Sequence, residues 1–199
     1  MLVPSVRGDD QRMEHIIRPV QAGDWEKSKE LRLTALLDPV ASIAFLDTYD
    51  KAVVQPDSYW QERARASSEA CRVITFVAEA PDGSWDGTVT VLVEDPEAEE
   101  GAVFGGAPSV PQTHIVGVFV RPERRGSGLI QALFDAAVEW SWALSEPRVE
   151  RIRLFVHEDN GRAMAVYRKA GFEPTGTTIP MQGDPDAKEY ELALARPAA

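Results

Sequence analysis

Cysteine and histidine are scarce in this chain of 199 residues, which has one cysteine, Cys71, and three histidines. A single cysteine excludes an intrachain disulfide framework and suits a reducing cytoplasm. Because so few histidines are available to activate a thiol, we interpret Cys71 as a small, half-buried filler rather than a nucleophile. The same scarcity leaves no spacing typical of metal ligands, so we expect no metal site.

Long apolar runs and net positive charge are also lacking. No stretch approaches the roughly 20 apolar residues of a membrane-spanning helix, and early acidic residues argue against a signal peptide. The chain carries 32 acidic and 21 basic residues, a formal net charge of −11. Most of this charge serves solubility. It also repels nucleic acid and attracts small cations, so we expect a cytoplasmic protein with neither a nucleic-acid nor a membrane partner.

The most informative segment runs from Val118 to Phe134. Its β-branched and aromatic beginning predicts a strand, and Pro122 ends that strand because proline cannot donate to a ladder. From Leu129 onward, apolar residues recur at helical spacing. A strand, a glycine-rich turn and a helix in this order direct unpaired backbone N–H groups and the positive end of a helix dipole at one point, with arginines around it. We therefore predict a phosphate site.

Two common phosphate-binding motifs do not fit this segment. A Walker A loop needs Lys and Ser or Thr after its second glycine, where Leu129 and Ile130 stand. A dinucleotide fingerprint needs a third glycine where Gln131 stands. The pattern V-x-P-x-x-R-G-x-G instead resembles the acyl-coenzyme A loop of the GNAT family of N-acetyltransferases, whose amides hold the pyrophosphate of coenzyme A.

The order of the other elements is predicted from periodicity and turn residues. Strands are expected at residues 15–20, 72–80, 88–93, 113–120, 151–157, 172–180 and 188–195, and helices from about residues 24, 57, 129 and 160. We interpret residues 1–14 as a flexible tail and residues 15–199 as one domain. The fold class is α/β (α+β): a mixed, mostly antiparallel sheet of about seven strands flanked by about four helices, in the order that the GNAT family shows.

A second motif lies about 40 residues after the first. The sequence N-x-x-A-x-x-x-Y-x-x-x-G-F resembles the segment that follows the fifth strand in the GNAT family. Its five matching positions are Asn160, Ala163, Tyr167, Gly171 and Phe172. Since two separate motifs occur in the right order, the chain is identified as a member of this family.

The resemblance implies an acetyl-CoA-dependent enzyme that transfers an acetyl group directly to an amine. It places coenzyme A against Val118, Phe119, Val120, Arg125, Gly126, Ser127, Gly128, Leu129, Ile130 and Asn160. Ile130 stands where the family has a small residue, so its side chain must turn inward. Asn160 is equally natural as a helix N-cap. Gly117 inside a strand indicates a bulge or a close approach, and a bulge would free an amide for the thioester carbonyl.

Two residues are candidates for the proton transfers. Tyr167 matches the family tyrosine that protonates the coenzyme A sulfur, although its spacing also suits a buried aromatic. His114 stands where many relatives have a glutamate and would serve as the general base, although a histidine at a surface strand end is an alternative. Glu79, Glu94 or a chain of water molecules could also take the proton.

The acceptor is predicted only as a class. The segments expected to wall its pocket carry Asp38, Asp47, Asp50, Asp57, Asp184 and Asp186. These residues favour a small polar or cationic amine, unless they are only loop formers and helix caps. The alternatives are a protein or peptide amine and a non-catalytic acyl-CoA sensor, while the net charge disfavours a nucleic-acid-directed enzyme. A homodimer is one candidate for the assembly.

Overall fold

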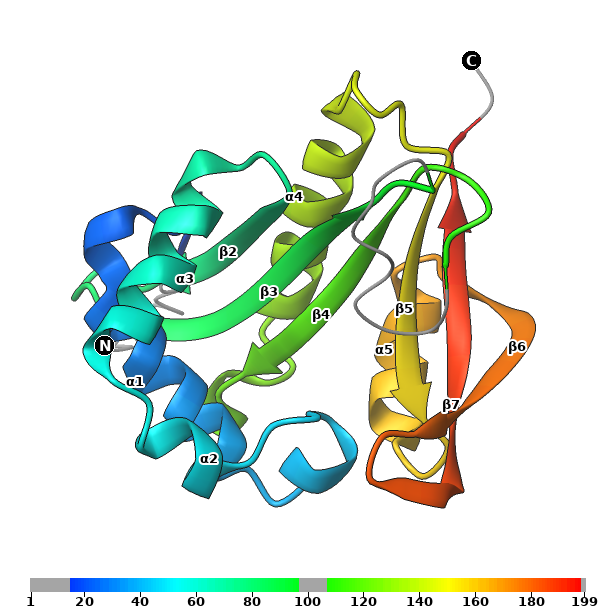
Figure 1. The fold of residues 1–199 in the computed structure, drawn as a ribbon. Helices are drawn as coiled ribbons and strands as arrows, with labels where there is room; N and C mark the ends of the chain where they lie inside the picture. The colour runs from blue at the N-terminus through cyan, green and yellow to red at the C-terminus, as the bar shows by residue number, and fades with distance from the viewer. Residues whose placement is uncertain (1–14, 97–106, 198–199) are drawn as a thin grey trace, which may run out of the picture.

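The computed structural model describes residues 15–96 and 107–197, and its centre is a seven-stranded sheet (Figure 1). The strand order is β1-β2-β3-β4-β5-β7-β6, and every neighbouring pair is antiparallel except β4 and β5. The strands are β1 Ile16–Pro19, β2 Val73–Glu79, β3 Trp85–Glu94, β4 Gln112–Val120, β5 Arg151–His157, β6 Glu173–Met181 and β7 Asp184–Ala195. The predicted mixed, mostly antiparallel sheet is confirmed. The predicted tail lies outside the described residues.

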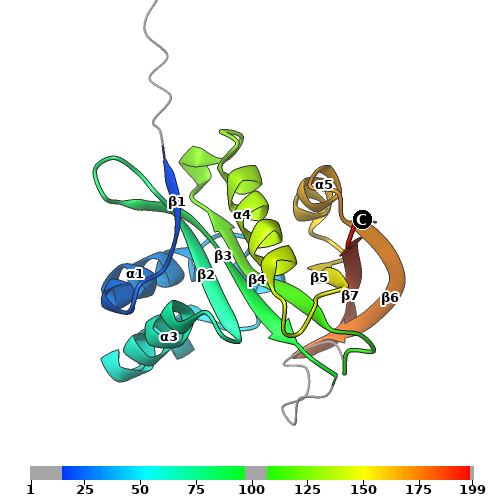
Figure 2. The same ribbon diagram turned by 90° about the horizontal axis from the view of Figure 1, so that it is seen from above.

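In the described part of the chain, five α-helices lie against the sheet. They are α1 Trp25–Leu36, α2 Tyr49–Val53, α3 Asp57–Glu69, α4 Leu129–Ala143 and α5 Gly161–Lys169. Seen from above, α1 and α3 lie on one face, whereas α4 and α5 lie on the other (Figure 2). The short α2 was not predicted. Five residues are too few for a periodic signal, and its cap is a single bond from the Lys51 N–H to Thr48 Oγ1.

Each face of the sheet has its own apolar core. The larger core joins the strands to α4, through Leu133, Phe134 and Ala137. The other core joins the opposite face to α1 and α3, through Leu31 and Ala64 among others. Because both faces are covered, the central strands read as nearly continuous apolar runs.

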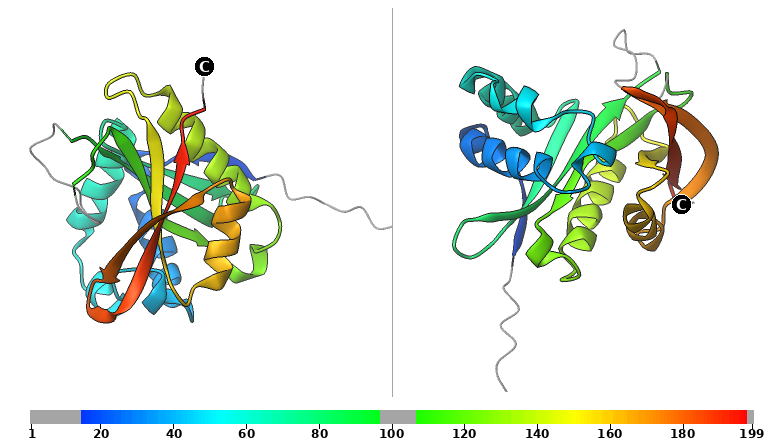
Figure 3. Two further views of the ribbon diagram at one scale, coloured as in Figure 1. Left: turned by 90° about the vertical axis from the view of Figure 1, so that its right-hand side faces the viewer. Right: turned by 90° about the horizontal axis from the view of Figure 1, so that it is seen from below.

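Several local predictions are confirmed and others are corrected. Strand β5 has the predicted bounds, and Gly171 follows α5 at φ 93°, where the Phe172 N–H donates to the Tyr167 carbonyl at 3.1 Å. Strands β3 and β7 begin earlier than predicted, at Trp85 and Asp184. Strand β6 contains two prolines and forms the outer edge of the sheet (Figure 3), which is where a strand tolerates them.

Capping of α1 differs from its prediction. Asp24 precedes the helix as expected, but its side chain makes no cap bond to the helix. Its carboxylate instead accepts from the Gln21 N–H at 2.8 Å and from Arg18 at 2.7 Å. The ion pair with Arg18 and the bond from Gln21 therefore take the place of the helix cap.

Strands β4 and β5 are paired only at one end and then part. Gln112 to His114 pair with Arg151 to Arg153, after which the two strands diverge toward the lower side of Figure 1. The rest of β4 has no strand partner on that side among the described residues. Its backbone polar groups there are available to something other than a strand.

A bulge interrupts β4 within this unpaired stretch. Thr88 of β3 lies opposite Phe119 and Thr90 opposite Val116, so β4 has one residue more than β3. Gly117 sits in the bulge at φ 62°, which confirms the predicted irregularity. The extra residue shifts the side-chain alternation, because Ile115 packs in the core on the α4 side whereas Phe119 packs in the core on the α1 side.

The helices of the described part of the chain include none that is both long and apolar enough to cross a membrane.

We expect Gly117→Ala to destabilise the protein. A Cβ at this position would meet Thr90 Oγ1 at 3.6 Å, so space is adequate and the penalty comes from the left-handed backbone. That penalty is about 1–2 kcal/mol in the free energy of unfolding, measurable by urea denaturation. The control is Gly23→Ala, where no atom lies within 4 Å and no left-handed angle occurs. Equal stabilities of the two variants would contradict the strained bulge.

Candidate active site

The glycine loop between β4 and α4 presents a group of unpaired amides. Gly126 and Gly128 have φ values of 81° and 93°, and no atom lies within 4 Å of a Cβ built on either. Among the described residues, no hydrogen bond is donated by the backbone N–H groups of Gly126, Gly128, Leu129, Ile130 and Gln131. With the helix dipole, this open loop can bind an anion.

The side chains around the loop leave that space open. Leu129 is buried, and Ile130 packs against the core on the α4 side. The inward orientation expected of Ile130 is therefore confirmed. Ser127 Oγ donates to the Arg124 carbonyl at 2.6 Å, so its hydroxyl stabilises the turn itself.

The arginines of the loop are already paired with acids. Arg121 donates to Glu30 at 2.8 Å and Arg124 to Asp86 at 3.0 Å, while Arg125 forms an ion pair with Asp38. These acids lie far away in the sequence, and they offset much of the positive charge that the arginines were predicted to supply. The backbone amides are thus the stronger part of the candidate anion site.

Asp38 links the loop to the segment after α1. Its side chain is 3% exposed, and it accepts from the Val40 N–H at 3.1 Å as well as from Arg125. Burial alone would raise the pKa of Asp38, but these two donors outweigh burial and lower it. The anionic carboxylate therefore ties the segment near Ala41–Ile43 to the end of β4.

His114 lies at the point where β4 and β5 part. It is 1% exposed, which rules out the alternative of a surface histidine. Its Nδ1 lies 3.0 Å from Glu94 Oε1 on β3, and Arg153 of β5 donates to Glu94 Oε2 at 2.7 Å. Burial by itself would raise the pKa of Glu94, but hydrogen bonds from His114 and Arg153 lower it to about 2. Since Glu94 is ionised and only accepts, His114 carries its proton on Nδ1.

The polar network continues from Arg153 across the sheet. Arg153 and Arg151 contact Glu191 of β7 at 3.4 and 3.3 Å, and Thr175 of β6 donates to the same carboxylate at 2.7 Å. Gln112 donates to Glu94 at 2.6 Å. Two carboxylates and two guanidinium groups thus share one buried layer, in which each charge has an opposite partner.

Tyr167 projects from α5 onto the core on the α4 side, where its ring lies 5.7 Å from that of Phe134. Burial raises the pKa of Tyr167 to about 12, with a smaller opposing effect from Arg162. The phenol is therefore protonated at neutral pH and can donate a proton. The packing interpretation is confirmed, and the hydroxyl keeps the hydrogen that the predicted role as an acid requires.

Asn160 caps α5, because its Oδ1 accepts from the Ala163 N–H at 3.2 Å. The capping role is therefore confirmed, and its side-chain amide group is a further donor. Val118, Phe119 and Val120 form the part of β4 beyond the bulge, next to the loop. The structure thus brings the predicted coenzyme A residues of β4 and the loop together along one strand and its turn.

The other predicted acids are mostly engaged. Glu79 on β2 binds Arg18 and Lys27, which lower its pKa to about 2, and it lies two strands away from β4. Among the aspartates of the predicted acceptor walls, Asp38 pairs with Arg125, and Asp57 lies 2.8 Å from Lys29. Their cationic partners come from distant segments. These two aspartates therefore lack the free negative charge that the sequence led us to expect. Cys71 is exposed rather than half-buried.

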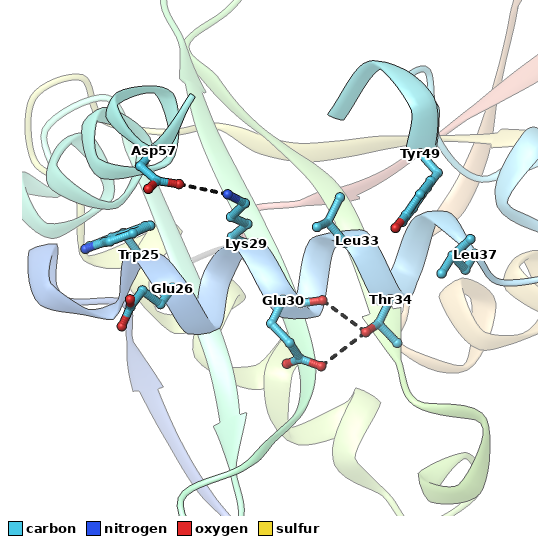
Figure 4. A pocket seen from close by; sticks show the side chains of 9 residues that line it. All are labelled: Trp25, Glu26, Lys29, Glu30, Leu33, Thr34, Leu37, Tyr49 and Asp57. Atoms are coloured by element: carbon cyan, nitrogen blue, oxygen red, sulfur yellow. Dashed lines mark hydrogen bonds and ion pairs between the residues drawn. The ribbon is translucent and has the colours of Figure 1, made fainter. Parts of the chain in front are cut away.

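A separate groove runs along α1 (Figure 4). Its volume is about 510 Å³, and it is lined by Trp25, Glu26, Lys29, Glu30, Leu33, Thr34, Leu37, Tyr49 and Asp57. Lys29 bonds Asp57 across it, and the Thr34 hydroxyl donates to the Glu30 carbonyl at 3.0 Å. Asp57, from the predicted acceptor walls, lines this groove, whereas the predicted catalytic and coenzyme A residues do not. Within residues 15–96 and 107–197, no three His, Cys, Asp or Glu side chains are grouped to hold a metal ion.

Comparison with known families gives one match over most of the chain. The model described as "Acetyltransferase (GNAT) family" matches residues 40–172, which include the loop and strands β2 to β5. A mycothiol acetyltransferase from Saccharomonospora viridis is 41% identical over 76 residues, which are 38% of this chain and 23% of that protein. The chain thus spans about a quarter of the length of this curated relative.

Solved structures with the same fold cover nearly the whole chain. An acetyltransferase of the GNAT family from Streptococcus pneumoniae has a TM-score of 0.71 at 16% identity, covering 92% of this chain and 99% of that one. The Arabidopsis thaliana protein NAA60, solved with acetyl-CoA, has a TM-score of 0.64 at 17% identity and covers 92% of this chain and 98% of that one. At these identities the likeness shows the fold.

Replacing Arg125 by glutamine should weaken acetyl-CoA binding. The guanidinium beside the loop amides can exchange Asp38 for a phosphate, and loss of such a charged hydrogen bond lowers affinity by about tenfold. The measurement is the rise in Tm that acetyl-CoA causes. Arg65→Gln on α3, where an exposed arginine pairs with Glu62, is the control and should keep the full rise. A full rise in the Arg125 variant would exclude Arg125 from the binding site.

Proposed function

Because the chain belongs to the acetyltransferase (GNAT) family, we propose that it transfers the acetyl group of acetyl-CoA directly to the amine of a small polar or cationic molecule. Acetyl-CoA is the acyl donor of this family. One observation supports the placement of the reaction: β4 and β5 part immediately after the buried His114–Glu94 pair, beside a bulge and upstream of the open glycine loop.

The cofactor would lie along the unpaired side of β4. The unpaired loop amides, those of Gly126 and of Gly128 to Gln131, would bind its pyrophosphate. The backbone of Val118 and Val120 would pair with its pantetheine arm. The acetyl group would then reach the bulge at Gly117. There, a backbone amide displaced from the ladder can donate to the oxyanion of the tetrahedral intermediate.

His114 would accept the proton of the attacking amine. Because Nδ1 faces Glu94, Nε2 would be the ring nitrogen that takes up the proton. Arg153 holds Glu94 in place, so the imidazole has one fixed orientation. Glu94 is therefore a positioning residue for His114 and not the base itself.

Tyr167 would donate the proton that the thiolate of coenzyme A takes up on leaving. Its raised pKa keeps the hydroxyl protonated throughout the neutral range. With the amine and the thioester held in one site, no covalent enzyme intermediate is needed.

The direct test is release of coenzyme A thiol from acetyl-CoA on addition of amines. The panel would contain small monoamines, diamines, amines that also carry a carboxylate, and peptides with free amino groups. We expect the highest kcat/KM for the small amines without a carboxylate. A preference for peptides would replace the small-molecule proposal, and the absence of thiol release with every amine tested would reduce the protein to a binding module. A cytoplasmic location and a homodimer stay predictions.

Replacing Tyr167 by phenylalanine should lower turnover by roughly 100-fold or more, since only the donor is removed while the ring keeps its packing. The rise in Tm with acetyl-CoA should stay as in the unmodified protein. As a control, Tyr59→Phe changes a tyrosine of α3 whose ring contacts Trp60, and it should leave turnover unaltered. Full activity of Tyr167→Phe would make Tyr167 a packing residue.

His114→Asn should lower kcat by about 100-fold or more, because the base is lost. The asparagine amide lies at the δ position, as Nδ1 does, so it can still donate to Glu94 and keep the buried pair bonded. His157→Asn on β5 is the control and should keep the full kcat. Full activity of His114→Asn would assign the proton transfer to another group.

A further inference from the structure

The face of the sheet opposite α4 carries a row of polar side chains. Thr113 donates to Ser141 of α4 at 2.9 Å, so its neighbour His114 lies on the opposite face. His114 is paired with Arg153 on β5, so these two side chains share a face of the sheet. His157 lies four residues after Arg153 on the same strand and therefore on the same face, and it is paired with Glu189 on β7. Glu189 therefore belongs to the same face as the candidate base.

The other buried carboxylates of this row are bonded. Glu94 accepts from three donors, and Glu191 accepts from Arg151, Arg153 and Thr175. A buried carboxylate without such partners would lose its hydration with no replacement. Cationic or polar donors replace the lost water molecules around Glu94 and Glu191, two of the three buried glutamates on this face.

Glu189 differs from them. It is 8% exposed, and its Oε2 is buried without a hydrogen-bond partner among residues 15–96 and 107–197. His157, its strand partner, makes no bond to this oxygen, and His157 Nδ1 accepts from the Asp159 N–H at 3.1 Å. Burial raises the pKa of Glu189, and His157 only partly opposes this rise. A buried carboxylate with an orphan oxygen is expensive for the fold, and it suits a cation supplied by a ligand.

The position of Glu189 limits which cation it can bind. Along β5, the partner of His114 is Arg153 and the partner of Glu189 is His157, four residues further on. Four residues of strand span roughly 13 Å, so Glu189 cannot contact an amine that is bonded to His114. A cation at Glu189 must be a second charged group of the same molecule.

We propose that Glu189 is the residue that selects an acceptor with two cationic groups, binding the distal ammonium group while the other amine is acetylated. This inference rests on the proposed function, in particular on transfer beside His114. The acceptor would be an extended diamine or a longer amine with a second cation, and Glu189 would contact the substrate without taking part in proton transfer.

The test compares linear diamines of increasing length with monoamines of the same length. In the unmodified protein, we expect one range of diamine lengths to exceed the matched monoamines in kcat/KM by about tenfold or more, the value of a charged hydrogen bond. Glu189→Gln should remove this preference by raising KM for the diamines while kcat and the monoamine values stay. Glu173→Gln, an exposed carboxylate on the adjacent strand β6, is the matched control and should keep the preference.

Two outcomes would overturn the proposal: no preference for diamines in the unmodified protein, or the same preference in Glu189→Gln. A direct measurement separates this failure from failure of the proposed function. The same series of linear diamines is titrated calorimetrically into the unmodified protein without acetyl-CoA, and the tightest binding should be lost in Glu189→Gln even if no amine is acetylated. Equal binding to both proteins would reject Glu189 as the cation site.

Discussion

The parting of β4 and β5 is the constraint on which the candidate site depends, and a buried ionic layer fixes where it occurs. Glu94 holds His114 on one strand and Arg153 on the other, so the three pairs between Gln112–His114 and Arg151–Arg153 are locked together. Buried ion pairs add little net stability, because desolvation offsets their attraction, but breaking one partner is costly. The layer thus specifies one register for a short parallel pairing. Beyond it, β4 is left with an open side next to the loop.

Two local features give the open side of β4 different binding groups at its two ends. Because of the bulge at Gly117, the side-chain alternation of β4 shifts by one residue, and one amide is displaced from the ladder. The loop after Val120 then gathers the amides that precede and begin α4. Because both features lie on the same strand as His114, an extended ligand along β4 would meet an anion site, a run of backbone groups and the candidate base in that order. Tyr167 enters from α5, which packs on the core beside α4.

Features set by neighbouring residues could be predicted from the sequence, and features set by distant ones could not. The bounds of β5, the helix end at Gly171 and the bulge at Gly117 follow from local chemistry, and each is as predicted. The pairing of Arg125 with Asp38, 87 residues away, has no local signal, so the loop was expected to be more positive than it is. Likewise, the burial of His114 depends on strands β3 and β5 together. The short α2 lacks enough residues for a period to be seen.

The carboxylates of this acidic chain show why charge counts alone say little about the acceptor. Asp38 and Asp57 carry the sign that attracts an amine, yet each is neutralised by a cation from another segment. Glu189 was indistinguishable in the sequence from its neighbour two residues on, since both stand on one face of one strand. Only the fold separates them, because it places two arginines beside Glu191, whereas Glu189 Oε2 has no hydrogen-bond partner within the part of the chain that the structure describes. Buried polar groups are normally hydrogen-bonded, and exceptions to this rule are expected at ligand-binding sites. The orphan oxygen of Glu189, rather than the net charge of −11, is therefore the observation that points to a cationic group in the acceptor.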